Sequence, residues 1–192
     1  MTLSEFQEWT GYFNLRVESN RDLLFPKELT KIMSVFPKNT GKLFAFSTSL
    51  VDWLPRNIER AMYLSSWETY PPDQMVIMKK FRLGCGESRN VIDAPAHLFE
   101  SQPIGNRYDM DEPARLGENR IVQESAEMAG LIFLAITFQW QGYILAKNCL
   151  DHIYLGDEFI VFHSDDSEKL KVTHELLAAY KLKVIQDAKA AW

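Results

Sequence analysis

The stretch HIYLGDEFIVF, residues 152–162, indicates the fold most directly. Two runs rich in β-branched and aromatic residues flank Gly156-Asp157, and a Gly-Asp pair between such runs is a signal for a β-hairpin. Because side chains alternate along a strand, Phe159 and Val161 should share one face of the sheet. The sequence therefore predicts an ordered antiparallel hairpin in the C-terminal part of the chain.

The segments on either side of this hairpin extend the pattern. Asp165, Asp166 and Glu168 predict the start of a helix after it, because acidic side chains favour the positive end of the helix dipole. Upstream, the sequence predicts a helix from Glu118 towards Phe138 and a strand over Gly142–Ala146, and downstream a last strand over 182–185.

Short apolar runs and turn residues divide the N-terminal half. Thr2 to Glu5 fits a capping box that begins a short helix, and Gly11 ends it. The apolar spacing and the prolines then predict a strand over 13–17, a helix over 26–36, a strand over 43–46, a helix over 55–66, a strand over 75–83 and a brief helix over 94–99.

These elements predict an α+β fold: a mixed, largely antiparallel sheet packed against helices, with a C-terminal β-hairpin followed by a helix. The chain has 192 residues, of which 46% are hydrophobic and 24% charged, as in an ordinary globular protein. We expect one domain over residues 1–192. The irregular loop over 84–117 is the internal lobe boundary that the sequence offers.

Negative charge is concentrated in one segment. From Asp109 to Glu168 there are twelve acidic and three basic residues, a net charge of −9, whereas the remainder of the chain carries +4. A nucleic-acid binder needs lysines and arginines to neutralise phosphates, so we expect no nucleic-acid partner. Clustered acids accelerate encounter with a basic protein instead, and a basic protein partner is our expectation.

Cysteine content and targeting signals favour the cytoplasm. Cys85 and Cys149 are too few for a disulfide framework, and the N-terminus shows no basic region followed by an apolar one. Residues 128–146 carry no charge, but Gln139 and Gln141 interrupt the run, which favours a buried helix or strand over a membrane span. We therefore expect a cytoplasmic protein without a membrane partner.

Aromatic and acidic residues are interleaved in the acidic segment. Tyrosine and tryptophan are enriched at binding hot spots, and acidic surfaces steer basic partners. Compact, acidic, aromatic-rich chains of this composition include many small bacterial immunity and antitoxin proteins. We therefore predict a non-enzymatic acidic binding protein, an immunity- or antitoxin-type inhibitor of a basic partner, with these binding residues: Tyr108, Asp109, Asp111, Glu112, Asp151, Tyr154, Asp157 and Glu158.

Two alternatives remain open. A small enzyme would use a site near Cys85, His97 and His163, since a cysteine nucleophile needs a histidine base. The flanking glycines of Cys85 and the lack of a matching motif favour a turn at Cys85. The sequence therefore leaves enzymatic activity uncertain and favours a protein that is not an enzyme. A structural subunit of a larger assembly would place residues 128–146 at an interface. Helix capping explains Asp165 and Asp166, so we expect no metal site, and no motif predicts a cofactor. The sequence does not indicate an oligomeric state.

Overall fold

The computed structural model describes residues 1–18, 22–55, 58–65, 69–85, 95–99 and 113–185, with side chains from residue 125 onward in its longest helix. The helices are α1 (Leu3–Gly11), α2 (Thr40–Trp53), α3 (Pro72–Gly84), α4 (Pro113–Thr137) and α5 (Ser167–Ala179). The strands are β1 (Arg16–Val17), β2 (Leu23–Leu24), β3 (Lys31–Val35), β4 (Arg60–Leu64), β5 (Ala96–Phe99), β6 (Gly142–Ala146), β7 (His152–Leu155) and β8 (Phe159–His163).

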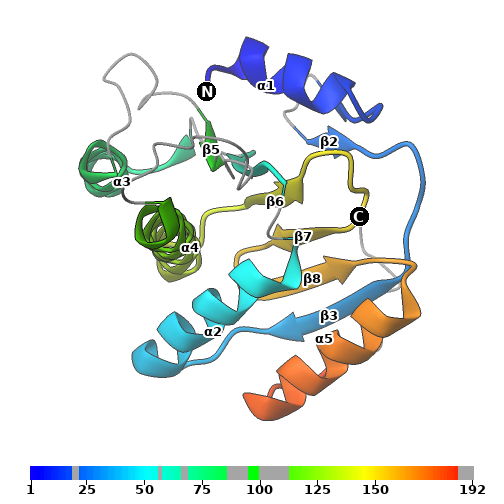
Figure 1. Cartoon of the computed structure of the whole chain (residues 1–192). Helices are drawn as coiled ribbons and strands as arrows, with labels where there is room; N and C mark the ends of the chain where they lie inside the picture. Colours follow the sequence, from blue (N-terminus) through cyan, green and yellow to red (C-terminus); the bar gives the residue numbers. More distant parts are fainter. Residues whose placement is uncertain (19–21, 56–57, 66–68, 86–94, 100–112, 186–192) are drawn as a thin grey trace.

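A six-stranded sheet with the order β3-β8-β7-β6-β4-β5 forms the centre of the fold (Figure 1). Every pair of neighbouring strands in it is antiparallel. Strands β1 and β2 form a separate antiparallel pair. The chain therefore has the predicted α+β fold, and among the described residues no helix is long and apolar enough to cross a membrane.

The larger core lies between one face of this sheet and the helices α2, α4 and α5. Inward-facing strand residues such as Ile144, Ile153 and Phe162 pack there against Phe46 and Leu50 of α2. Helices α2 and α4 lie against each other along this layer. Burial of this apolar surface is the main source of the stability of the fold.

A smaller core lies on the opposite face, under α1 and the β1–β2 pair. The ring of Phe6 stacks on Tyr63 of β4 with centroids 4.4 Å apart, and Trp9 is buried beside it. The predicted capping box of α1 is present, since Thr2 and Glu5 exchange both hydrogen bonds. Helix α1 and the β1–β2 pair lie over β6, β4 and β5. On the same face, β7 and β8 carry aromatic and histidine side chains.

The predicted C-terminal hairpin and the helix after it are confirmed. Strands β7 and β8 form the hairpin, and Ile160 and Phe162 enter the larger core, whereas Val161 faces the other way. The carboxylate of Asp166 caps α5 by accepting from the Glu168 and Lys169 amides. The predicted last strand is reduced to one bridge, between Ser34 and Val184.

Several N-terminal predictions are wrong. Residues 31–35 form the strand β3 instead of a helix, with alternating exposure, and residues 40–53 form the helix α2, whose N-cap Asn39 accepts from the Lys42 amide. Residues 60–64 form the strand β4, and 72–84 form the helix α3. In β4 every residue is buried, because both faces of this central strand are covered, and the period of two is lost.

The irregular segment is also shorter than predicted. Residues 96–99 form the strand β5 rather than a brief helix, and pairing with β4 explains why, since tertiary contacts override weak local preference. The long helix begins at Pro113 rather than near Glu118, and proline suits the first turn of a helix. The rest of the predicted 84–117 loop lies mainly outside the described residues.

Candidate functional site: an aromatic and acidic surface at the hairpin tip

The structure divides the predicted binding residues into three groups. Tyr154, Asp157 and Glu158 lie together where β7 turns into β8. Asp151 lies at the opposite end of β7, which is about 13 Å long at 3.3 Å per residue. The other four predicted residues lie outside the described part of the chain: Tyr108, Asp109, Asp111 and Glu112.

The turn between the two strands is short and closed. The Gly156 amide donates to the Phe159 carbonyl at 2.8 Å. The Phe159 ring lies directly on Gly156, where an added Cβ would come within 2.6 Å of the ring, so a glycine is needed for this close approach. Asp157 and Glu158 are exposed at the turn, and their side chains are presented to solvent.

A cross-strand row of rings lies next to these carboxylates. Tyr143 of β6 and Tyr154 of β7 are register partners with ring centroids 5.0 Å apart. Phe159 of β8 lies 6.0 Å from Tyr154. All three side chains are half-buried: Tyr154 and Phe159 lie on strands that α1 does not cover, whereas Tyr143 also packs against the smaller core. Such aromatic surface is typical of binding hot spots.

The electrostatics of this row bring in a residue that sequence analysis missed. Burial, followed by the negative charges of Asp22 and Asp157, raises the pKa of Tyr154 to about 12. Burial also raises the pKa of Tyr143, and the charge of Asp22 is the next cause. Asp22 directly precedes Leu23, whose backbone hydrogen-bonds the Tyr143 hydroxyl, and its negative charge acts on both hydroxyls, which stay protonated at neutral pH. We call Asp22, Tyr143, Tyr154, Asp157, Glu158 and Phe159 the tip surface.

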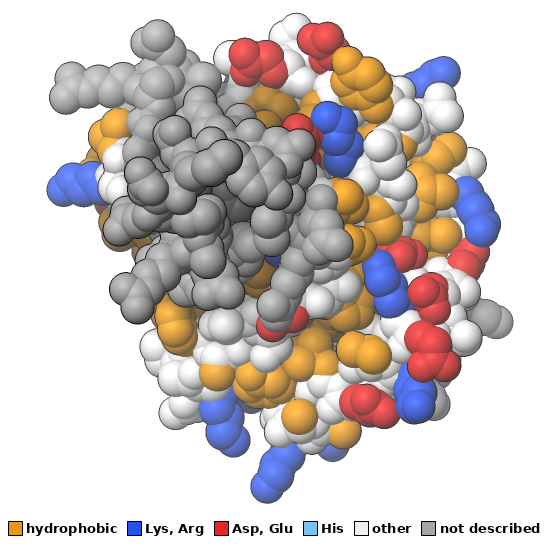
Figure 2. Space-filling model, viewed as in Figure 1, with side chains coloured by type: hydrophobic (Ala, Val, Ile, Leu, Met, Phe, Trp, Pro, Cys, Tyr) orange, Lys and Arg blue, Asp and Glu red, His pale blue; other side chains and the backbone are white. Residues whose placement is uncertain are grey.

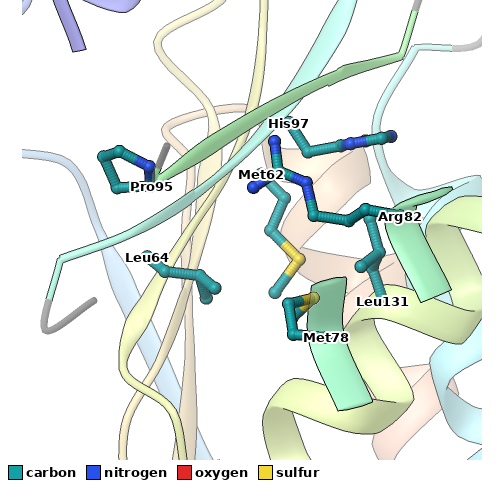
Figure 3. Close-up of a pocket in the computed structure, with 7 residues that line it drawn as sticks. All are labelled: Met62, Leu64, Met78, Arg82, Pro95, His97 and Leu131. Atoms are coloured by element: carbon teal, nitrogen blue, oxygen red, sulfur yellow. The ribbon is translucent and has the colours of Figure 1, made fainter. Parts of the chain in front are cut away.

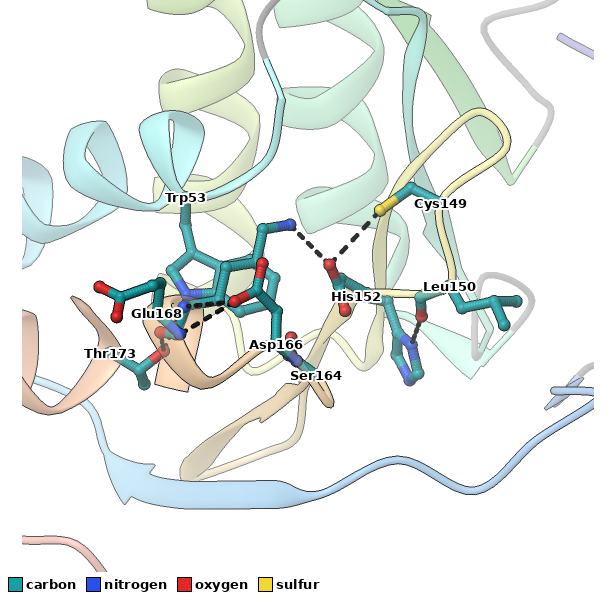
Figure 4. A network of polar contacts seen from close by, with 10 residues as sticks. Trp53, Cys149, Leu150, His152, Ser164, Asp166, Glu168 and Thr173 are labelled. Atoms are coloured by element: carbon teal, nitrogen blue, oxygen red, sulfur yellow. Dashed lines mark hydrogen bonds and ion pairs between the residues drawn. The ribbon is translucent and has the colours of Figure 1, made fainter. Parts of the chain in front are cut away.

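Asp151 belongs to a different network, which Figure 4 shows. Its carboxylate pairs with Lys169 of α5 at 2.7 Å and accepts from the Cys149 thiol at 3.6 Å. The Lys169 ammonium lies 5.0 Å from the Trp53 ring, whose indole donates to Thr173. Burial raises the pKa of Cys149. This network joins the β6–β7 loop to α2 and α5. It gives Asp151 a structural role within the fold that requires no binding partner.

The other acids near the N-terminus of α5 are also engaged. Asp165 pairs with Lys27 and accepts from the Thr30 amide, and Asp166 caps α5. The described acids of the predicted acidic segment therefore do not form one cluster: some lie at the hairpin tip, others at the opposite end of the hairpin, and Glu127 lies in α4. On the described part of the face in Figure 2, acidic and basic side chains are interspersed.

A stacked pair of histidines lies next to the tip surface on the same sheet face. His152 and His163 are register partners with ring centroids 4.1 Å apart, and Phe25 stacks on His152 at 3.6 Å. The Leu150 carbonyl can only accept, so the 2.7 Å contact assigns the proton of His152 to Nδ1. Burial lowers the pKa of His152 to about 4 and that of His163 to about 3.

The residues of the enzyme alternative are not brought together as a set. His97 is on β5 and His163 on β8, four strand spacings or about 19 Å apart in the sheet. Cys85 follows the end of α3. His97 and the buried Arg82 line a cavity of about 10 Å³, which is the size of one water molecule (Figure 3). Among the described residues, no group of three or more potential ligands could hold a metal ion.

Comparison of the chain with protein-family models, with curated proteins and with solved structures finds no match.

Proposed function

We propose that the protein is a non-enzymatic binding protein, an inhibitor of the immunity or antitoxin type, which recognises a basic protein partner through the tip surface. The observation that carries this proposal is the row of three half-buried rings beside exposed carboxylates. Aromatic rings supply contact area at low cost in side-chain entropy, and nearby carboxylates attract lysine and arginine.

Three features support binding by this surface. Tyr143 and Tyr154 remain neutral hydrogen-bond donors, so the charge of the surface comes from its carboxylates alone. The rings sit on strands of the central sheet, which holds them rigidly before a partner arrives. A cation can also lie over an aromatic face while it pairs with a carboxylate.

The cysteines fit the proposed location of the protein in the cytoplasm. Cys85 and Cys149 form no disulfide, which suits a reducing compartment.

Site-specific photo-crosslinking tests the proposal. A benzoylphenylalanine at position 158 should capture a basic protein from the native host, and the yield should fall at about 0.5 M salt, where screening shortens to a few ångströms. The matched control places the same probe at Glu175, which is exposed on α5. Equal capture from both positions, or capture of an acidic protein at position 158, would contradict the proposal.

A further inference from the structure

We infer that Gln141 is a positioning residue of the tip surface, which holds the hairpin turn in the conformation that presents Asp157 to the partner. This inference rests on the proposed function. Gln141 lies between α4 and β6, and sequence analysis did not single it out as a binding residue.

The backbone of Gln141 is firmly anchored. It follows Trp140, which is fully buried, donates from its backbone to the Ala135 carbonyl at 2.8 Å and donates from its indole to Gln74 at 2.9 Å. The Gln141 carbonyl accepts from the Ser65 amide at 3.1 Å and from the Tyr70 hydroxyl at 3.3 Å. The side chain is therefore carried by a backbone that hydrogen bonds to Ser65 and Tyr70 hold in place.

From this corner the side chain reaches across to the hairpin turn. Its Nε2 donates to Oδ1 of Asp157 at 2.8 Å, and the Tyr154 hydroxyl donates to its Oε1 at 3.5 Å. A carboxylate can only accept, so the amide nitrogen has to face Asp157 and the amide oxygen has to face Tyr154. One amide thus connects a ring and a carboxylate of the tip surface.

This contact reduces the freedom of an exposed carboxylate before binding. An exposed aspartate at a turn samples several rotamers, and ordering them costs free energy when a partner binds. A hydrogen bond to a charged acceptor from a fixed donor removes part of this cost in advance. A positioned Asp157 should therefore slow dissociation, whereas the charge itself governs the rate of encounter.

Gln141→Glu separates these two effects. The new side chain has the same shape, cannot donate to Asp157 and adds a negative charge beside the tip surface. On charge alone the variant should bind a basic partner faster and more tightly. If Gln141 positions Asp157, the partner identified by crosslinking should instead dissociate about tenfold faster. This factor corresponds to the loss of one charge-assisted hydrogen bond. Gln7→Glu, on the exposed face of α1, is the control for added charge.

A measurement on the free protein makes the inference independent of the partner. In both Gln141→Glu and Gln141→Ala, hydrogen exchange of the Gly156 amide, which donates to the Phe159 carbonyl across the turn, should rise about tenfold. Exchange at Ile153 in the core of β7 should stay unchanged, which shows that the fold is intact. Unchanged exchange at the turn in both variants overturns the inference and leaves the proposed function standing. A wild-type protein that binds no basic partner overturns the proposed function instead.

Discussion

Lowering the pH from 7 to 4.5 is expected to destabilise the fold by a few kcal/mol, chiefly through the stacked histidines. Burial is the largest cause that lowers the pKa of His152 to about 4, and burial followed by the charges of His152 and Lys31 lowers that of His163 to about 3. The other groups that face His152 are Phe25, Tyr143 and the nearby carboxylate of Asp151.

The sign follows from the two states. Below about pH 6.5 the unfolded chain binds protons at both histidines, whereas the folded protein stays neutral there until about pH 4. Stability is therefore complete above pH 6.5 and is lost as the pH falls towards 4. For His152 alone the loss is on the order of 3 kcal/mol, from about 1.4 kcal/mol per pKa unit.

Urea denaturation between pH 7 and 4.5 measures this effect. Three carboxylates with lowered pKa values contribute little to the change in stability over this pH range, because their stabilising effect is lost only below about pH 4.5. These carboxylates are Glu5, Glu59 and Asp165. His163→Phe keeps a ring against His152 and should remove part of the pH dependence. His174→Gln on the exposed face of α5 is the control. If the unfolding free energy of wild type and of His163→Phe changed equally with pH, the account would be contradicted.

A single methyl group at Gly142 is expected to cost about 1–3 kcal/mol of unfolding free energy. A Cβ there would lie 2.3 Å from the Tyr63 carbonyl oxygen and 3.1 Å from Leu64 Cα, both backbone atoms of the neighbouring strand β4. Strands β4 and β6 would have to separate where β6 begins, directly after Gln141. Hydrogen exchange of the Gly156 amide at the β7–β8 turn should therefore rise as well.

Thermal unfolding of Gly142→Ala measures this cost. Gly84→Ala is the matched control, because an added Cβ at that exposed helix end meets nothing within 4 Å. The control should be neutral or slightly stabilising, since alanine loses less backbone entropy than glycine on folding. Equal melting temperatures for the two variants would show that β4 and β6 do not approach as closely as described.

The C-terminal half could be predicted from sequence because its signals are local. The Gly156-Asp157 turn and the acids before α5 each act within a few residues. The capping box of α1, in the N-terminal half, could be predicted for the same reason. The rest of the N-terminal half depends on distant contacts. A short apolar run such as 43–46 fits a strand or a buried helix equally, and β4 is covered on both faces, so neither segment shows its period.

The candidate site divides in the same way. Tyr154, Asp157 and Glu158 are neighbours in sequence, and the hairpin keeps them together. Asp22 and Gln141 join them only because β2 lies over β6 and the start of β6 lies beside the end of β7. No local pattern marks either residue. Asp151 is close to these residues in sequence, but the extended strand β7 separates it from them.

The central claim is that carboxylates at the tip surface attract a basic partner. The most direct test is a stopped-flow measurement of the association rate with the partner identified by crosslinking, at about 50 mM and about 300 mM salt. The double variant Asp157→Lys, Glu158→Lys should associate about tenfold more slowly at low salt and lose most of the salt dependence. Glu8→Lys, Glu175→Lys changes the net charge equally at exposed positions on α1 and α5, and reversal of Lys79 and Lys80 changes α3; both should have little effect. Association that is independent of salt, or equally slowed by the tip variant and its matched control, would contradict the account.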